Sequence, residues 1–190
     1  MAYTTIDDPT DYFRVKLYAG NATNDTAITW DETDTNMQPD WLWGKSRTDA
    51  QAPWIFDSVR GATLRLLPYS GDDEGTENTN LDSFDTNGFQ VDNEAIVNGA
   101  SRNYVVWGWK AGTSFTNDAS STGIGGVDSA GSFNNAAGFS IVTYNGNAGN
   151  TTVKHGMNIA PKMVWFKRRD AGSTNWYIYH ASIGQGKRLV

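Results

Sequence analysis

Residues 12–18 read Tyr-Phe-Arg-Val-Lys-Leu-Tyr, with apolar side chains alternating with Arg14 and Lys16. Successive side chains of a β-strand point to opposite faces of a sheet, so this alternation predicts a strand with one face on a core and the other in solvent. Gly20 and Asn21 follow, and they predict a turn. Strand and turn signals of this kind decide the fold class.

Further apolar segments continue this pattern along the first half of the chain. Strands are predicted over residues 41–43, 54–56, 62–67 and 104–110. A polar loop around residues 46–50 joins the first two and predicts a hairpin. Phe84 and Phe89 bracket a second predicted hairpin, because the pair Asn87-Gly88 is a strong turn signal. No long window repeats apolar residues at helical spacing, so the sequence predicts an all-β fold.

The motif of the first strand recurs late in the chain. Phe13, Val15, Tyr18 and Gly20-Asn21 correspond to Phe139, Ile141, Tyr144 and Gly146-Asn147 at a constant offset of 126 positions. Pro39, Trp43, Lys45, Arg47 and Trp54 correspond to Pro161, Trp165, Lys167, Arg169 and Trp176 at an offset of 122, and Arg65-Leu66 corresponds to Arg188-Leu189 at 123. Anchors that keep their order while the loops change length indicate a duplicated β unit.

These patterns predict two related β-sandwich units of jelly-roll-like type. We expect an N-terminal arm over residues 1–11, a first unit over 12–112 and a second unit over 138–190. Residues 113–137 are rich in Gly, Ser, Ala, Asn and Thr, which predicts a linker or long loop. The second copy ends about halfway through the motif, so we expect either that the full protein continues, which we favour, or that a partner chain supplies the missing strands.

Composition limits the functions to consider. The chain has 190 residues, a net charge of -6 and no cluster of Lys and Arg, so we expect no nucleic-acid partner. It has no cysteine, which excludes disulfides and thiolate metal sites. No segment approaches the roughly 18 apolar residues of a membrane span, and the acidic start lacks the apolar region of a signal peptide. We expect a protein made in the cytoplasm, without a classical export signal or membrane insertion.

The sequence contains no recognisable catalytic motif. Its two histidines, His155 and His180, are each interpreted as structural. Residues 83–94 match the spacing of a calcium-binding loop, but their flanks alternate like strands, so the hairpin is the preferred interpretation. A carboxylate pair for glycoside hydrolysis is the weakest alternative, since the 21 acidic residues show no distinctive pair. We expect a non-enzymatic protein with no catalytic residue, no cofactor and no metal.

Four tryptophans are the candidate contact residues. Trp41, Trp43, Trp107 and Trp109 could stack on sugar rings or contact a protein partner. The alternative is that they fill a sandwich core, where aromatic rings bury large apolar areas. We favour the core, because Trp43 recurs as Trp165 at a matched repeat position and a ligand contact need not be kept in both copies.

Several motifs occur together in a fixed order. They are Tyr18-Ala19-Gly20-Asn21, Gln38-Pro39-Asp40-Trp41-Leu42-Trp43, Phe56-Asp57-Ser58-Val59-Arg60-Gly61-Ala62, Phe84-Asp85-Thr86-Asn87-Gly88-Phe89, Tyr104-Val105-Val106-Trp107-Gly108-Trp109-Lys110-Ala111-Gly112, Gly138-Phe139-Ser140-Ile141-Val142-Thr143-Tyr144 and Ala160-Pro161-Lys162-Met163. As a set they resemble virion structural and tail-fibre-like proteins of marine bacteriophages, including cyanophages, from residue 12 onward. The resemblance implies an oligomeric appendage or decoration protein of the particle and carries over no catalytic residue.

The resemblance and the duplicated β unit together predict a virion component. We expect a tail fibre or tail-appendage protein that anchors the appendage or contacts the host. The alternatives are a capsid decoration or head-fibre protein, and a carbohydrate-binding module that recognises host surface glycan. Expected partners are other virion proteins and copies of the chain itself, with a trimer favoured by analogy with fibres. The expected location is the virion, assembled in the host cytoplasm.

Overall fold

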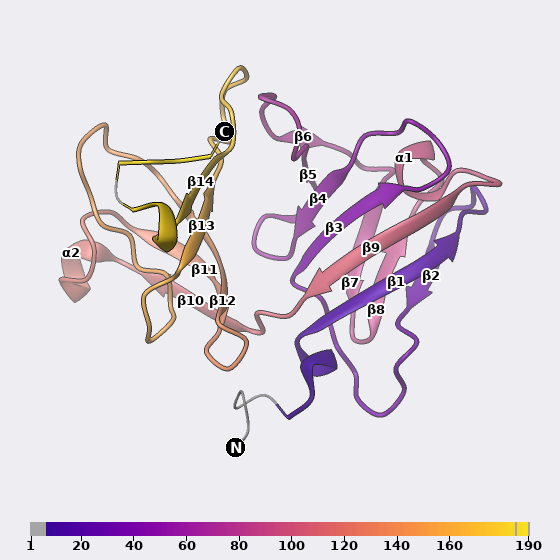
Figure 1. Ribbon diagram of the computed structural model, residues 1–190, viewed down its shortest axis with the longest axis horizontal. Helices are drawn as coiled ribbons and strands as arrows, with labels where there is room; N and C mark the ends of the chain where they lie inside the picture. The colour runs from indigo at the N-terminus through magenta and orange to yellow at the C-terminus, as the bar shows by residue number, and fades with distance from the viewer. Residues whose placement is uncertain (1–6, 185, 190) are drawn as a thin grey trace.

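The computed structural model describes residues 7–184 and 186–189 (Figure 1). It confirms the predicted all-β fold, with short strands in several antiparallel sheets and only brief helical turns. Part of the expected N-terminal arm, residues 1–6, lies outside the described residues. The described start forms the 3-10 helix η1 (Pro9–Asp11). No helix within the described residues is long and apolar enough to cross a membrane.

The first nine strands form two packed sheets, which we call the N-terminal sandwich. The strands are β1 (Phe13–Ala19), β2 (Thr26–Thr29), β3 (Trp41–Ser46), β4 (Trp54–Asp57), β5 (Gly61–Leu66), β6 (Gly75–Thr76), β7 (Leu81–Asp85), β8 (Gly88–Val91) and β9 (Asn103–Trp109), with the short helix α1 (Ala95–Asn98) before β9. One sheet has the order β1-β9-β3-β4-β5-β6, and the other has the order β2-β8-β7. Both predicted hairpins form, as β3–β4 and β7–β8.

The apolar core of the sandwich lies between these two sheets. It consists of Ile28, Trp30, Met37, Leu42, Trp54, Phe56, Leu81, Phe89, Val91, Val97 and Val106. Strand alternation explains this set, because Leu42, Trp54 and Val106 point inward while their sequence neighbours point to the outer face of the six-stranded sheet. The residues of that outer face are not buried by the second sheet.

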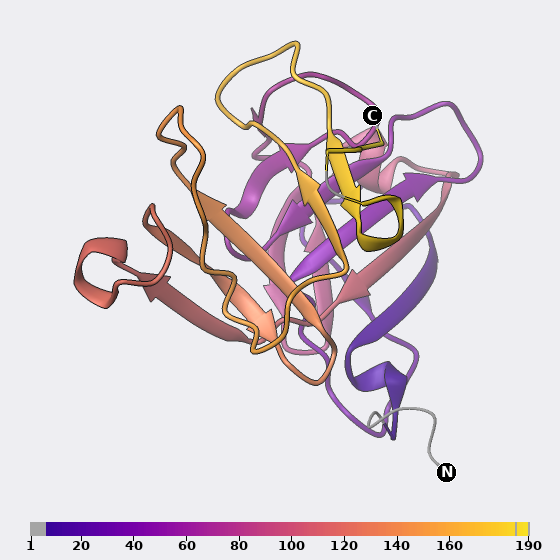
Figure 2. The same ribbon diagram turned by 60° about the vertical axis from the view of Figure 1, so that its left-hand side comes forward.

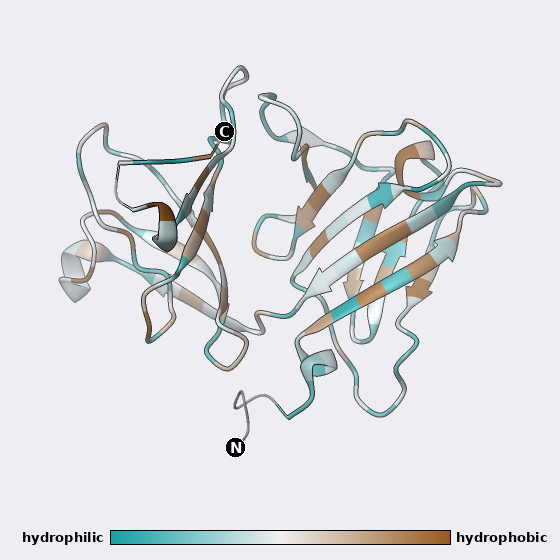
Figure 3. Cartoon of the chain, in the orientation of Figure 1, coloured by the Kyte–Doolittle hydropathy of each residue, from teal (hydrophilic) through white to brown (hydrophobic). Residues whose placement is uncertain are grey.

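The alternation of apolar and polar residues in β1 appears as alternating bands in Figure 3. The apolar face of this strand, however, does not point toward the core. Its apolar side chains face outward, with Val15 41% and Leu17 55% exposed, whereas Arg14 is 1% exposed. The buried guanidinium is satisfied, because Nε donates to the Thr10 carbonyl at 2.7 Å and Nη2 donates to the Thr35 carbonyl at 3.0 Å. A buried charge with full hydrogen bonding reverses the orientation that apolarity alone predicts.

The rest of the chain forms a smaller lobe, the C-terminal part. Its elements are β10 (Thr113–Asn117), α2 (Ala119–Thr122), β11 (Ser129–Asn134), β12 (Phe139–Tyr144), β13 (Met163–Phe166), β14 (Tyr177–His180) and the 3-10 helix η2 (Ala181–Ile183). The sheets have the orders β10-β11-β12 and β13-β14. These sheets do not close into a second sandwich within the described residues, so the two-unit organisation stays a prediction.

The prediction of a linker or long loop over residues 113–137 is wrong, because β10, α2 and β11 lie there. The strands are built from small residues, and Ser129, Gly131 and Ser132 are buried. At Gly131 a side chain would overlap the backbone of the neighbouring strand β12. Small residues let strands approach closely, but they give no alternation of large apolar side chains from which a strand is predicted.

Two stacked tyrosines, Tyr18 and Tyr104, predict that the stability of the sandwich falls at alkaline pH. The Tyr18 hydroxyl donates to the Val97 carbonyl at 2.6 Å, and its ring stacks on Tyr104. Burial raises the pKa of Tyr18 well above its usual value near 10, and Tyr104 adds to the shift. A raised pKa in the folded state contributes stability that is complete below pH 10 and is lost as pH rises toward the folded-state pKa.

We therefore expect the free energy of unfolding to fall with pH above about 10, and to fall less steeply in Tyr18→Phe. Urea unfolding at a series of alkaline pH values measures both slopes. Equal slopes for the two proteins would show that Tyr18 does not cause the loss.

Candidate functional site

The four tryptophans singled out from the sequence come together on the outer face of the six-stranded sheet. Trp41 pairs with Trp109 across β3 and β9, and Trp43 pairs with Trp107 in the next row. All four side chains are only partly buried, and none belongs to the core between the sheets. The favoured core interpretation is therefore wrong for these positions, because in β3 and β9 the inward positions belong to the residues that alternate with the tryptophans.

The C-terminal part lies beside the six-stranded sheet (Figures 1 and 2). It packs on the outer face through its own aromatic rings. The Phe139 ring centroid lies 6.3 Å from those of both Trp41 and Trp109. The Trp165 ring lies 5.8 Å from Trp43 at an interplanar angle of 76°, and 6.3 Å from Trp176. Edge-to-face and offset contacts at these separations are favourable for aromatic pairs. We call this contact between the two lobes the aromatic interface.

The aromatic interface extends along the sheet beyond the rings. Ile55 and Leu66 lie in the same cross-strand row as Trp43, on the outer face, yet they are 0% and 5% exposed. Nearby, the Trp176 indole N–H donates to the Leu67 carbonyl at 2.9 Å. Apolar side chains on an outer face become buried only under another layer, so the C-terminal part acts as that layer at this end of the sheet.

Polar contacts connect the same two lobes at the rim. Glu74 accepts hydrogen bonds from Arg169 at 3.1 Å and from the largely buried Arg60 at 2.8 Å, and Arg60 also donates to Asp57 at 2.6 Å. Lys167 donates to the Ser70 carbonyl of the N-terminal sandwich at 3.4 Å, and within its own lobe to the Thr174 carbonyl at 2.6 Å. Burial lowers the pKa of Lys167, and the carboxylates of Asp72 and Asp73 oppose this shift.

These contacts change how the candidate contact residues are interpreted. Trp41, Trp43 and Trp109 each touch a ring of the C-terminal part, whereas Trp107 makes its aromatic contact with Trp43 inside the sheet. The four rings are therefore not a free platform for sugars. Trp41, Trp43 and Trp109 form one side of the contact between the two lobes of this chain, and contact of these tryptophans with a separate partner stays a prediction.

Sequence reasoning missed most of the opposite side of this interface. The repeat pattern identifies Phe139, Trp165 and Trp176 only as anchors, although an aromatic anchor on a strand is also a candidate for packing. The Asp57–Arg60–Glu74 cluster had no sequence signal, because its members come from a turn and a distant loop. Arg168, next to Arg169 in the sequence, pairs locally with Asp170 at 2.8 Å.

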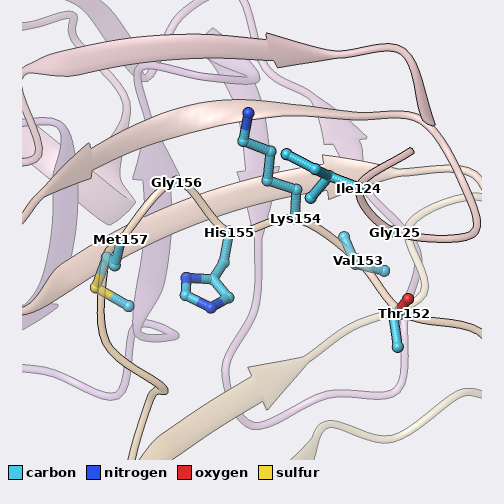
Figure 4. Close-up of a pocket in the computed structure, with 8 residues that line it drawn as sticks. All are labelled: Ile124, Gly125, Thr152, Val153, Lys154, His155, Gly156 and Met157. Atoms are coloured by element: carbon cyan, nitrogen blue, oxygen red, sulfur yellow. The ribbon is translucent and has the colours of Figure 1, made fainter. Parts of the chain in front are cut away.

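The two histidines lie in separate settings in the C-terminal part. His155 lines a hollow with Ile124, Gly125, Thr152, Val153, Lys154, Gly156 and Met157, none of which is a carboxylate (Figure 4). His180 accepts a hydrogen bond from the backbone N–H of Ser182 at 3.2 Å and caps η2. Among the described residues, no group of three His, Asp or Glu side chains is placed to hold a metal ion.

Comparison with known proteins identifies the family but no characterised relative. No curated protein and no solved structure matches the chain. The model of the family described as "Domain of unknown function (DUF7483)" matches residues 8–190, which include both lobes and the aromatic interface. The chain therefore belongs to the DUF7483 family.

Proposed function

We propose that this protein is a structural component of a bacteriophage virion, namely a tail fibre or tail-appendage module that anchors the appendage or contacts the host. The observation that carries the proposal is the apolar surface of the C-terminal part. Among the described residues, ten large hydrophobic side chains are exposed, and seven belong to this part: Ile124, Tyr144, Ile159, Met163, Trp165, Phe166 and Leu189. A high share of exposed apolar side chains in one part of a protein favours a surface that another protein covers.

The architecture supports the same proposal. The two lobes are joined by a sheet face rich in aromatic rings, with a buried ion cluster at its rim. An assembly of sheets that leaves apolar surface and, among the described strands, edges without a strand partner suits a building block for a larger particle. The ordered set of motifs that resembles tail-fibre-like proteins adds an independent reason for placing the particle among the phages.

The direct test is to locate the chain in purified particles of the virus that encodes it. Mass spectrometry of the particles and immunogold labelling against the chain are expected to find it at the tail. Labelling spread over the capsid would replace the tail proposal with a decoration or head-fibre role. Particles that lack the chain would overturn the virion proposal altogether.

Self-association gives a second test that needs only the purified protein. Because exposed apolar surface favours association, we expect light scattering after size exclusion to give a multiple of the 20.8 kDa chain mass, with a trimer favoured. A concentration series would distinguish a stable oligomer from weak aggregation. A mass of one chain at every concentration would contradict the self-assembling part of the proposal.

A further inference from the structure

The chain contains three Asn-Gly pairs, which are Asn87-Gly88, Asn98-Gly99 and Asn145-Gly146. An asparagine in this setting can lose ammonia without an enzyme, because the backbone nitrogen of the next residue can reach the side-chain carboxamide. Glycine has no side chain to hinder that approach, and its backbone is the least restricted of all residues. The reaction needs a carboxamide and a backbone that are free to move, so the surroundings of each pair determine whether it occurs.

The first pair is held in the N-terminal sandwich. The Asn87 side-chain oxygen accepts hydrogen bonds from Arg14 Nη1 at 3.1 Å and from the Met37 backbone N–H at 3.2 Å. Gly88 begins β8 and is packed so closely against β2 that an added Cβ atom would overlap the Ile28 carbonyl. Hydrogen bonds therefore restrain the carboxamide of this pair, and strand packing restrains its backbone.

The second pair is restrained at both reacting groups. Asn98 is 0% exposed. Its side-chain nitrogen donates to Asn21 Oδ1 at 3.0 Å and to the Thr23 carbonyl at 2.9 Å, and its oxygen accepts from the Asn21 backbone N–H at 3.0 Å. The nitrogen that would attack is engaged as well, because the Gly99 N–H donates to the Tyr104 hydroxyl at 2.8 Å. Cyclisation at this pair requires local unfolding.

The third pair is open to solvent directly after β12. Residues 145–150 are all exposed and belong to no strand or helix. Within the part of the chain that the structure describes, neither the Asn145 side chain nor the Gly146 backbone N–H has a hydrogen-bond partner. A Cβ atom built at Gly146 would meet no atom within 4 Å. Neither reacting group of this pair is held by a described residue.

We propose that Asn145 is a site of spontaneous deamidation, and that the fold confines this reaction to Asn145 among the three pairs. The Gly146 backbone nitrogen attacks Cγ of Asn145 and forms a new N–C bond. The bond from Cγ to the amide nitrogen breaks, and that nitrogen takes the proton of the Gly146 N–H and leaves as ammonia. Water then opens the five-membered succinimide at either carbonyl, which leaves aspartate or isoaspartate.

The modification changes the surface at the end of β12. A neutral carboxamide becomes a carboxylate, which adds one negative charge to a chain of net charge -6. The isoaspartate product also lengthens the main chain by one carbon. Asn145 lies beyond the last strand pair, Ser129–Tyr144, so the β11–β12 pairing remains intact. Anion exchange is therefore expected to resolve a folded, more acidic form that accumulates with time.

Peptide mapping by mass spectrometry measures the reaction at each pair during incubation of the intact chain at mildly alkaline pH. Digestion at acidic pH keeps further deamidation low during the analysis. We expect Asn145 to react about tenfold faster or more than Asn87 and Asn98, because the fold must first open locally at those two positions. Equal rates at the three positions of the folded chain, or no reaction at Asn145, would overturn the proposal.

Two glycine variants in the same loop test the mechanism. Gly146→Ala places a methyl group beside the attacking nitrogen, and the open space around Gly146 accommodates it, so this folded variant should lose most of the reaction at Asn145. Gly149→Ala is the matched control, because it adds the same methyl group but follows Ala148 instead of an asparagine. The control should react like the unaltered chain. Equal reaction in both variants would contradict attack by the Gly146 nitrogen.

Concentrated urea separates the effect of the fold from that of the local sequence. Unfolding releases Asn87 and Asn98 from their hydrogen bonds, so the three pairs are expected to react at similar rates in urea. If the preference for Asn145 stayed the same in urea, local sequence rather than the fold would select it, and the proposal would be overturned. These measurements need only the purified chain and do not depend on a virion location.

Discussion

Replacement of Gly44 by valine is expected to destabilise the N-terminal sandwich by about 3 kcal/mol, because the core has no room for a side chain there. Gly44 faces inward from β3 and pairs with Trp54 of β4, and a Cβ atom at Gly44 would overlap the Trp54 ring. That ring is 0% exposed, and its indole N–H donates to the Ile96 carbonyl at 3.1 Å. The ring cannot move away without breaking this bond and displacing the core.

Urea unfolding followed by circular dichroism measures the effect of Gly44→Val. The control is Phe166→Val in β13, because it places the same residue in a strand where the original side chain is 43% exposed. A substitution at an exposed position away from special features changes stability by about 0.5 kcal/mol or less, although loss of a partly buried ring adds somewhat to this. Equal losses in the two variants would mean that the tight contact with Trp54 is not the cause.

The strands of the N-terminal sandwich could be predicted because large apolar residues mark them. All six residues of 41–43 and 54–56 are aromatic or large aliphatic, because both faces of the sheet are covered there, one by the core and one by the C-terminal part. The Asn87-Gly88 signal also located its hairpin correctly. Only Gly88 takes a positive φ, however, and the Asn87 side chain instead accepts a hydrogen bond from Arg14.

The predictions that failed share one physical cause: the burial or conformation of each residue depends on partners far away in the sequence. The buried state of Arg14 requires the carbonyls of Thr10 and Thr35, and no local pattern announces them. Strands β10 and β11 are held by close backbone approach at residues such as Gly131, which composition alone assigns to a loop. The alternation in β9 predicts that Trp107 and Trp109 share a face, but not that this face is the outer one.

The second large effect on stability is expected at the Asp57–Arg60–Glu74 cluster, at the rim of the aromatic interface. Arg60→Met is expected to lower the free energy of unfolding by about 3–5 kcal/mol, because breaking a buried ion pair leaves an uncompensated charge. The side chains of Arg60 and Asp57 are each 3% exposed, and that of Glu74 is 13% exposed. Methionine preserves most of the side-chain volume, so the loss measures missing charge and hydrogen bonds more than a cavity. Urea unfolding at neutral pH gives the value.

Arg169→Met is the control within the same cluster, because Arg169 also pairs with Glu74 but is 39% exposed. An ion pair open to solvent contributes roughly 0–1 kcal/mol, so this variant should be close to the unaltered protein. Similar losses in both variants would indicate that the connection between the lobes, rather than burial of Arg60, determines stability. A small loss in Arg60→Met would mean that water reaches Asp57 once the guanidinium is gone, and the cluster would then be a rim contact of ordinary strength.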